Sequence, residues 1–148
     1  MRLALGCDEA GFNLKTKIME HLDGMGVEYD DFGANKGESV LYPNVAKSVA
    51  EAIAEGRYER GILICGTGIG MAITANKVPG IRAAVCHDPF STERSRKSNN
   101  AQIMCMGERV MGSELAKSLV DIWLKSEFSM KRGIWVKVFN RDREVIYK

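Results

Sequence analysis

The sequence predicts an α/β fold, a doubly wound five-stranded parallel sheet with helices on both faces. The chain has 148 residues, which is the size of one compact domain. Apolar runs of four to six residues alternate with segments of helical period, as in repeated βαβ units. The most apolar run, residues 60–65, has the composition of a central parallel strand. We therefore expect residues 1–148 to form a single domain.

The helices are predicted by amphipathic spacing and by stop signals. In residues 13–25 apolar side chains recur every three or four positions, and a glycine follows as a stop signal; the apolar residues are Leu14, Ile18, Leu22 and Met25. Pro43 fits the first turn of the next helix, because its missing N–H would have no partner there. In chain order we expect strands at 2–7, 28–32, 60–65, 82–86 and 101–106, and helices at 13–25, 43–55, 71–77, 89–99 and 112–128.

The tail, residues 129–148, is basic and aromatic. It has too little apolar surface to pack by itself, so we expect it to pack on a second subunit. The formal net charge of +2, without a long basic stripe, argues against a nucleic-acid partner. Every apolar run is far shorter than the roughly 20 residues of a membrane helix, and the N-terminal residues lack the pattern of a signal peptide. We expect a cytoplasmic protein without a membrane partner.

Four cysteines end four apolar runs, at Cys7, Cys65, Cys86 and Cys105. None belongs to a CxxC pair, and two histidines are too few for a zinc site. A domain of this length has enough apolar core to fold without disulfides. We therefore expect no metal site, and buried thiols in a reducing compartment.

Polar residues follow the strands at the edge where doubly wound sheets bind ligands. They are Asp8 and Glu9, the glycine-rich run at 65–70, His87 and Asp88, and the segment after Cys105. In the run at 65–70, alternate glycines allow close approach of a ligand and turn backbone N–H groups toward it. The helix that follows adds the positive end of its dipole, so an oxyanion or a phosphate is the expected guest.

Cys65 opens this run. A thiol beside a helix N-terminus and several N–H groups should have a lowered pKa, which suits a nucleophile or a proton-abstracting base. The alternative is a packed thiol, which we expect for Cys7, Cys86 and Cys105. His87 follows a strand, where it could be an acid–base group or a surface histidine next to a helix N-cap. The charged residues Lys15, Lys17, Glu93, Arg94 and Arg96 are expected on solvated helix faces.

Four segments, at 6–15, 42–43, 61–71 and 75–83, carry a resemblance to a known family; they read GCDEAGFNLK, YP, GILICGTGIGM and ANKVPGIRA. Together they resemble the type B ribose-5-phosphate isomerases, a family that also includes galactose-6-phosphate isomerase subunits. The resemblance covers residues 2–128 and is weak in the tail. It implies a cofactor-independent, metal-free aldose–ketose isomerase with a doubly wound fold. It also implies a homodimer whose active sites use residues of both chains, with the C-terminal segment reaching across, and which could pair into a homotetramer.

The resemblance also implies roles for individual residues. Cys65 would be the base that moves a proton between carbons 1 and 2. Thr67 and the loop N–H groups would hold the enediolate oxygens, the loop residues being Gly66, Gly68, Ile69 and Gly70. Asp8 would contact sugar hydroxyls. Further substrate and phosphate contacts would come from Asn99, Arg109 and Arg132, and from Lys137 in place of a family arginine that aligns with Val136.

Two positions depart from the family pattern. The family usually has histidine where this chain has Glu9, and a ring-opening histidine where it has Ser98. A hydroxyl is far too weak an acid to replace imidazole near neutral pH. A tetrose with phosphate on oxygen 4 cannot close a five-membered ring and needs no ring-opening acid. The combination of His87 with the run at 98–102 also resembles the erythrulose-4-phosphate isomerase branch.

The leading hypothesis is therefore an isomerase of erythrose 4-phosphate and erythrulose 4-phosphate, with His87 as the acid–base partner of Cys65. The alternatives are a ribose 5-phosphate isomerase with a relocated acid, and a non-catalytic subunit of a heteromeric sugar-phosphate isomerase. Retention of the Cys65 thiol argues against the last of these. A nucleotide-binding module is less favoured, because no dinucleotide fingerprint follows the first strand.

Overall fold

The computed structural model describes residues 1–129, 136–137 and 146–147. Its main sheet has five strands, all parallel, in the spatial order β2-β1-β3-β5-β4. The predicted fold class is confirmed. The strands are β1 (Arg2–Cys7), β2 (Glu28–Asp31), β3 (Arg60–Cys65), β4 (Ala83–Val85) and β5 (Ile103–Gly107).

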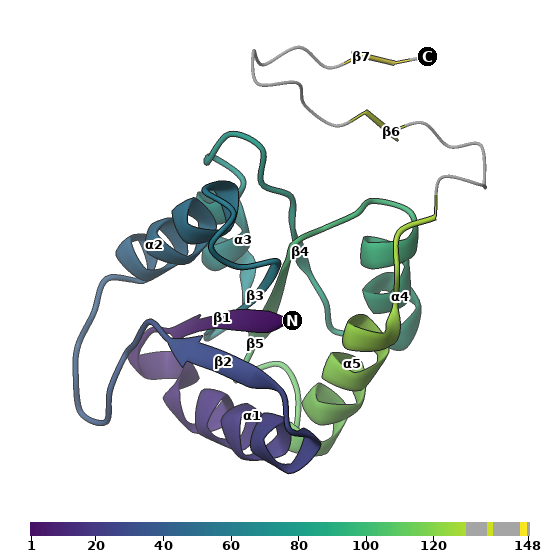
Figure 1. Ribbon diagram of the computed structural model, residues 1–148. Helices are drawn as coiled ribbons and strands as arrows, with labels where there is room; N and C mark the ends of the chain where they lie inside the picture. The colour runs from purple at the N-terminus through teal and green to yellow at the C-terminus, as the bar shows by residue number, and fades with distance from the viewer. Residues whose placement is uncertain (130–135, 138–145, 148) are drawn as a thin grey trace.

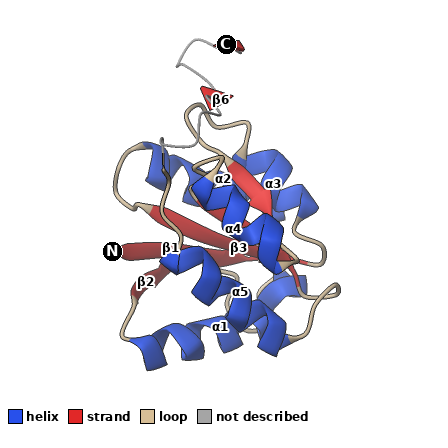
Figure 2. Ribbon diagram, turned by 90° about the vertical axis from the view of Figure 1, so that its right-hand side faces the viewer, coloured by secondary structure: helices blue, strands red, loops and turns tan. Residues whose placement is uncertain are grey.

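Helices cover both faces of this sheet (Figure 1). One face packs against α1 and α5, with α4 beside α5, and the other packs against α2 and α3. Figure 2 shows the strands between these two helical layers. The helices are α1 (Phe12–Met25), α2 (Tyr42–Ala54), α3 (Ile69–Ala75), α4 (Pro89–Lys97) and α5 (Ser113–Lys125), and a short 3-10 helix, η1 (Glu9–Gly11), precedes α1. In the tail, β6 (Val136–Lys137) pairs with β7 (Ile146–Tyr147) antiparallel.

The core has two halves because successive strand residues face opposite sides of a sheet. In β3, Ile62 and Ile64 pack toward α1 and α5, whereas Leu63 and Cys65 pack toward α2 and α3. β3 is buried along its whole length, as its composition predicts for a central strand.

Local signals set the helix ends. Gly26 adopts φ +68° after α1, and its N–H bonds to the carbonyls of the last turn. Pro43 occupies the first turn of α2, as predicted. Met25 is the last residue of α1 and is 41% exposed.

The connections create a crevice between β1 and β3. The chain leaves β1 toward the face covered by α1, and it leaves β3 toward the face covered by α3. Adjacent strands with oppositely directed connections form the usual ligand-binding crevice of a doubly wound sheet. Cys7 pairs with Ile64 in this register, so Asp8 and Cys65 follow at the same edge.

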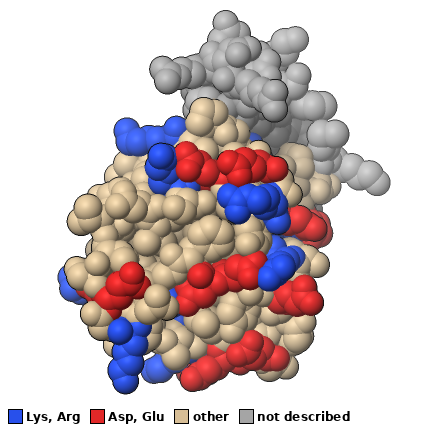
Figure 3. All heavy atoms as spheres, turned by 60° about the vertical axis from the view of Figure 1, so that its left-hand side comes forward, with Lys and Arg blue, Asp and Glu red and all other residues tan. Residues whose placement is uncertain are grey.

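In the described part of the chain, no helix combines the length and apolarity needed to cross a membrane. On the face shown in Figure 3, acidic and basic side chains are interspersed with uncharged ones.

Candidate active site

The Cys65 thiol lies where the crevice opens, at the carboxyl end of β3. Its Sγ accepts a hydrogen bond from the backbone N–H of Gly68 at 3.1 Å, and the residue is 6% exposed. Gly68 adopts φ +78°, and a Cβ there would lie 3.0 Å from the backbone of Met106. The turn that aims this N–H at the sulfur therefore requires glycine.

The loop after β5 holds the glycine-rich loop in place. Glu108 N–H donates to the carbonyl of Cys65 at 2.9 Å, and Arg109 N–H donates to that of Gly66 at 3.1 Å. Gly107 packs directly on Thr67, since a Cβ on Gly107 would lie 2.6 Å from the Thr67 Cα. Two backbone hydrogen bonds and one close backbone contact thus fix the two loops against each other.

Arg109 supplies positive charge beside this loop. Its side chain lies over Gly66, where a Cβ would be 3.4 Å from the arginine Cδ and 3.5 Å from a guanidinium nitrogen. Arg109 is exposed, and its guanidinium has no ion-pair or hydrogen-bond partner among the described residues. A cation with open donors beside a set of backbone N–H groups is suited to an anionic ligand.

Thr67 and Ile69 form the outer surface of the loop, and both are exposed. The Thr67 hydroxyl accepts a hydrogen bond from Ile69 N–H at 3.3 Å. Gly70 lies under the ring of Tyr42, because a Cβ there would be 2.7 Å from a ring carbon. Sequence reasoning assigned Tyr42 no role. The sequence feature that could have indicated a role for Tyr42 is its position just before Pro43, within a segment that carries the family resemblance.

Asp8 and Glu9 line the β1 side of the crevice. Oδ1 of Asp8 accepts hydrogen bonds from the N–H groups of Ala10 and Gly11 at 3.0 and 3.1 Å. Burial raises the pKa of the Asp8 carboxyl, the two backbone donors oppose that rise, and the charge of Glu9 adds to it. Glu9 is exposed, and its carboxylate accepts a hydrogen bond from Val40 N–H at 3.4 Å, which ties it to the loop before α2.

His87 follows β4 and reaches the same edge. Its Nε2 accepts a hydrogen bond from Gly107 N–H at 3.0 Å. Gly107 also packs on Thr67, so it links the ring to the glycine-rich loop. Burial lowers the pKa of His87, while the nearby charge of Asp88 opposes that change. Asp88 also caps α4, because its carboxylate accepts a hydrogen bond from Ser91 N–H at 2.8 Å.

The other three thiols are packed, as predicted. Cys7, Cys86 and Cys105 are fully buried. Burial raises the pKa of Cys7 to about 11, and it also raises the pKa of Cys86 and of Cys105. Thiols with raised pKa values stay protonated near neutral pH, so these three are not available to take a proton from carbon.

Asn99 lies at the amino-terminal ends of the parallel strands, whereas Cys65 lies at their carboxyl ends. It follows the C-terminal end of α4 and precedes β5 by four residues, whereas Gly107, which pairs with Cys65, ends β5. At about 3.3 Å per residue, the rise from Ile103 to Gly107 alone is about 13 Å. Within one chain, therefore, Asn99 and Cys65 do not meet. Arg132 lies outside the described residues, and Lys137 is described only as part of the backbone of β6.

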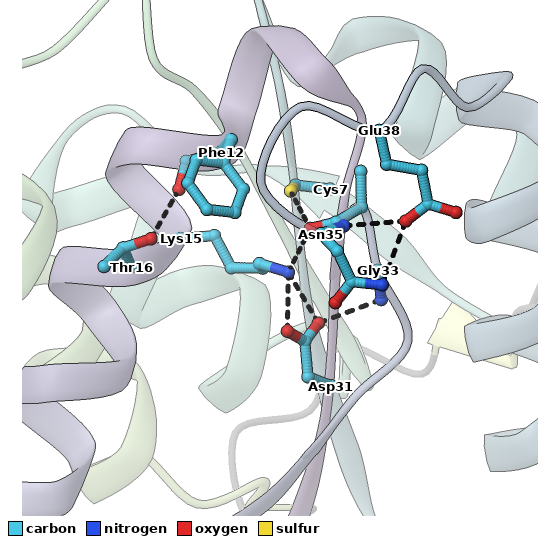
Figure 4. Close-up of polar contacts among 9 residues, drawn as sticks. Cys7, Phe12, Lys15, Thr16, Asp31, Gly33, Asn35 and Glu38 are labelled. Carbon is cyan, nitrogen blue, oxygen red and sulfur yellow. Dashed lines mark hydrogen bonds and ion pairs between the residues drawn. The ribbon is translucent and has the colours of Figure 1, made fainter.

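Two charged residues that we expected on solvated faces are buried. Lys15 is 1% exposed, and its Nζ bonds to both carboxylate oxygens of Asp31 and to the carbonyl of Ala34, each at 2.7 Å (Figure 4). Arg96 is 6% exposed and donates to the carbonyl of Ala101 at 2.8 Å. In both cases a loop folds over the charged group and provides oxygen acceptors, which the helical pattern alone does not reveal.

Glu108 was also missed by sequence reasoning. Its carboxylate accepts hydrogen bonds from Leu14 N–H at 2.9 Å and from the side chain of Asn13 at 3.2 Å. It therefore caps α1 from the loop after β5, across 94 residues of sequence, and it sits beside Arg109. No local pattern indicates such a cap.

Within the described residues, His, Cys, Asp and Glu form no group of three or more that could hold a metal ion.

The family model described as Ribose/Galactose Isomerase matches residues 3–135. A ribose-5-phosphate isomerase B from Listeria innocua is 56% identical over 133 residues, which is 90% of each chain. A D-erythrulose-4-phosphate isomerase from Pectobacterium atrosepticum is 50% identical over 129 residues, 86% of this chain and 85% of the relative. The structure of ribose-5-phosphate isomerase B from Clostridium thermocellum superimposes with a TM-score of 0.84 at 51% identity and 86% coverage of both chains. The chain therefore belongs to the ribose/galactose isomerase family and is a sugar-phosphate aldose–ketose isomerase.

Proposed function

We propose that this isomerase interconverts erythrose 4-phosphate and erythrulose 4-phosphate through an enediolate, without a cofactor. The observation that carries the chemistry is the hydrogen bond from Gly68 N–H to the Cys65 sulfur. The thiolate is the form of a cysteine that can accept a proton from carbon, and a backbone N–H at 3.1 Å is positioned to hydrogen-bond its sulfur.

In the aldose-to-ketose direction, the Cys65 thiolate removes the proton on carbon 2. The C–H electron pair forms the carbon 1–carbon 2 double bond, and the carbonyl π electrons move to oxygen 1. Thr67 and the loop N–H groups would hold the enediolate oxygens, which is the preorganised stabilisation that lowers such barriers most. Cys65 then returns the proton to carbon 1, and the hydroxyl proton of oxygen 2 passes to oxygen 1. Arg109 would attract the phosphate, and Asp8 and Glu9 would contact hydroxyls.

Ser98 supports a four-carbon substrate. The family resemblance implies a ring-opening histidine at this position, and serine cannot replace it as an acid. A tetrose 4-phosphate has no five-membered ring to open, so its isomerase needs no such group. The relative from Pectobacterium atrosepticum, named for erythrulose 4-phosphate, is consistent with this substrate.

Ribose 5-phosphate is the second candidate substrate, and the relative from Listeria innocua named for it favours it. A ring-opening acid would then have to come from another residue. Comparing initial rates on both sugar phosphates tests the two candidates. We expect kcat/KM for the tetrose ester to exceed that for ribose 5-phosphate by at least about a hundredfold, because the pentose ring would stay closed. A preference for ribose 5-phosphate would overturn the tetrose assignment.

The variant Ser98→His sharpens this comparison. Restoring imidazole should raise activity on ribose 5-phosphate while leaving activity on the tetrose ester within a few fold. Ser98→Ala is the matched control, because it changes the same position without adding an acid. Equal activity of the two variants on ribose 5-phosphate would argue against a ring-opening role at this position.

We also propose that a second copy of the chain completes the site. The amino-terminal ends of the strands, opposite Cys65, are where Asn99 lies and where α5 ends. In sequence, α5 is followed by the tail that contains Arg132 and Lys137. If Asn99 binds substrate, it must therefore reach the Cys65 crevice of another subunit, and the family resemblance implies the same for Arg132 and Lys137. A symmetric homodimer provides two such sites.

Mixing two inactive variants tests the shared site. Cys65→Ala removes a group that each chain contributes to its own site, and Asn99→Ala removes a group that each chain contributes to the site of its partner. In a mixed dimer, therefore, one site carries both defects and the other carries neither. Random reassociation should restore about a quarter of the wild-type activity. Failure to recover activity in mixed dimers would place both residues in one chain's site or in none.

The Cys65 role is tested by exchange of substrate hydrogen with solvent deuterium. Cys65→Ala should abolish exchange and leave sugar-phosphate binding within a few fold. Cys105→Ala, which removes a packed thiol, should retain exchange. Exchange by Cys65→Ala would remove Cys65 from the mechanism. Inactivity of the wild-type chain alone, with recovery on adding a related subunit, would support the non-catalytic-subunit alternative.

A further inference from the structure

The protonation state of the His87 ring follows from one contact. The backbone N–H of Gly107 points at Nε2 of His87, with a nitrogen-to-nitrogen distance of 3.0 Å. A backbone N–H can only donate, so Nε2 must carry a lone pair rather than a proton. The neutral ring then holds its proton on Nδ1. A cationic ring would place a second donor against the Gly107 N–H.

The surroundings favour the neutral ring. Burial lowers the pKa of His87, and the charge of Asp88 opposes this change. The Asp88 carboxylate is engaged at the N-terminus of α4, where it accepts the Ser91 N–H. In the described part of the chain, Nδ1 has no hydrogen-bond partner, so its proton is available to a ligand.

The contact also connects the ring to the chemistry. Gly107 ends β5, and it packs on Thr67 and Gly66, the residues that follow the Cys65 base. The imidazole is thereby held by the same backbone that supports the glycine-rich loop. A group fixed in this way keeps its orientation when substrate binds, which is the requirement for electrostatic stabilisation of a developing charge.

We propose that His87 acts as a neutral imidazole that donates a hydrogen bond from Nδ1–H to the oxygen on which charge develops during isomerisation. This inference rests on the isomerase chemistry proposed above and assigns the donor atom. A neutral donor stabilises the enediolate oxygen without giving up its proton, so the ring enters and leaves the reaction in the same state. Other enzymes that form enediolates use a neutral histidine in this role.

The chain provides an internal control, because it has two histidines. Nε2 of His21, in α1, lies 2.7 Å from Oδ1 of Asp121 in α5. An ionised carboxylate can only accept, so Nε2 of His21 carries a proton. The two histidines are thus expected to differ at Nε2 in the same sample.

Long-range proton–nitrogen correlation spectra of the whole protein, labelled with nitrogen-15 in histidine, report which ring nitrogen is protonated. At neutral pH we expect one histidine with an unprotonated Nε2 and a protonated Nδ1, which His87→Gln removes from the spectrum. The other histidine should show a protonated Nε2. A protonated Nε2 at His87 would overturn the proposal, whatever the activity of the enzyme.

Two substitutions separate the two ring nitrogens. His87→Gln can place an amide oxygen near Nε2 to accept the Gly107 N–H, but it supplies no donor near Nδ1. His87→Asn can place an amide N–H near Nδ1, but it leaves the Gly107 N–H without its acceptor. We expect His87→Gln to keep the wild-type melting temperature within a few degrees and to lose about 10²-fold in kcat. His87→Asn should melt lower and retain at least about tenfold more kcat than His87→Gln.

The reverse order of kcat, or wild-type kcat in His87→Gln, would overturn the role of Nδ1–H. Absence of isomerase activity in the wild-type protein on both sugar phosphates would instead overturn the proposed function. The spectra distinguish the two failures, because they test the protonation of His87 without substrate.

Discussion

The Lys15 ammonium lies 2.7 Å from both carboxylate oxygens of Asp31, although Lys15 is only 1% exposed. The same nitrogen bonds to the carbonyl of Ala34, whose N–H bonds to the carbonyl of Cys7 at 2.6 Å. Figure 4 shows the side chain extending from α1 into this turn. Lys15 thus joins α1 to the turn after β2 and to the end of β1, next to Asp8.

Lys15→Met should destabilise the fold by about 2 to 4 kcal/mol, because it leaves Asp31 and the Ala34 carbonyl without their cation. Methionine keeps the apolar part of the lysine side chain, so the loss of stability measures the contribution of the ammonium group. Urea unfolding monitored by circular dichroism measures it. Lys17→Met, at an exposed position on the same helix, is the control and should change stability by less than about 0.5 kcal/mol. Equal effects of the two variants would contradict the structural role of Lys15.

Glu108→Ala should cost about 1 to 2 kcal/mol, because it removes the acceptor for Leu14 N–H at the start of α1. Its side chain also bonds to Asn13, so the first turn of α1 should become less protected against amide hydrogen exchange. Glu114→Ala is the control, since that side chain is 85% exposed and bonds to Lys117 on its own helix. Unchanged exchange at Leu14 in Glu108→Ala would contradict the cap.

Gly107→Ala should lower kcat by about tenfold or more. Its Cβ would lie 2.6 Å from the Thr67 Cα and 2.9 Å from the Gly66 carbonyl oxygen, so the glycine-rich loop would have to shift away from β5. Steady-state kinetics measures the loss. Gly24→Ala is the matched control, because nothing lies within 4 Å of its Cβ. That variant should keep kcat and gain about 0.5 to 1 kcal/mol in stability, since alanine favours the helix. Wild-type kcat in Gly107→Ala would show that this contact does not set the loop position.

Stability should fall as pH rises from about 9 to about 11. Burial raises the pKa of Cys7 to about 11, so the folded chain keeps a proton that the unfolded chain releases from about pH 9 upward. The free energy of unfolding therefore decreases with pH in this window, by up to about 1.4 kcal/mol per pH unit for this thiol. Below pH 9 both states hold the proton and the contribution is constant.

Cys7→Ala isolates this contribution from other groups that titrate at alkaline pH. Urea unfolding at several pH values should show that the stability difference between wild type and variant is constant from pH 7 to about pH 8.5 and shrinks above about pH 9. A difference that stays constant to pH 11 would mean that the folded and unfolded thiols ionise alike.

Most elements of the fold were predictable because their signals are local. β1 (Arg2–Cys7) and β3 (Arg60–Cys65) have the expected bounds, since each is a continuous apolar run ended by polar or glycine residues. The helix expected at 71–77 begins earlier, at Ile69, because Gly68 in a left-handed conformation already starts the turn. The helix expected at 89–99 ends at Lys97 and leaves Asn99 in the turn that follows.

The sequence by itself determined the alternation of strands and helices and the set of groups at the carboxyl edge, because periodicity and strand ends are properties of neighbouring residues. Only the tertiary structure decided where charge is buried and which nitrogen of His87 is free. Lys15 depends on Asp31 and Ala34, Glu108 on Leu14, and His87 on Gly107. Each of these contacts joins segments that the folded sheet brings together, so no local pattern contains them.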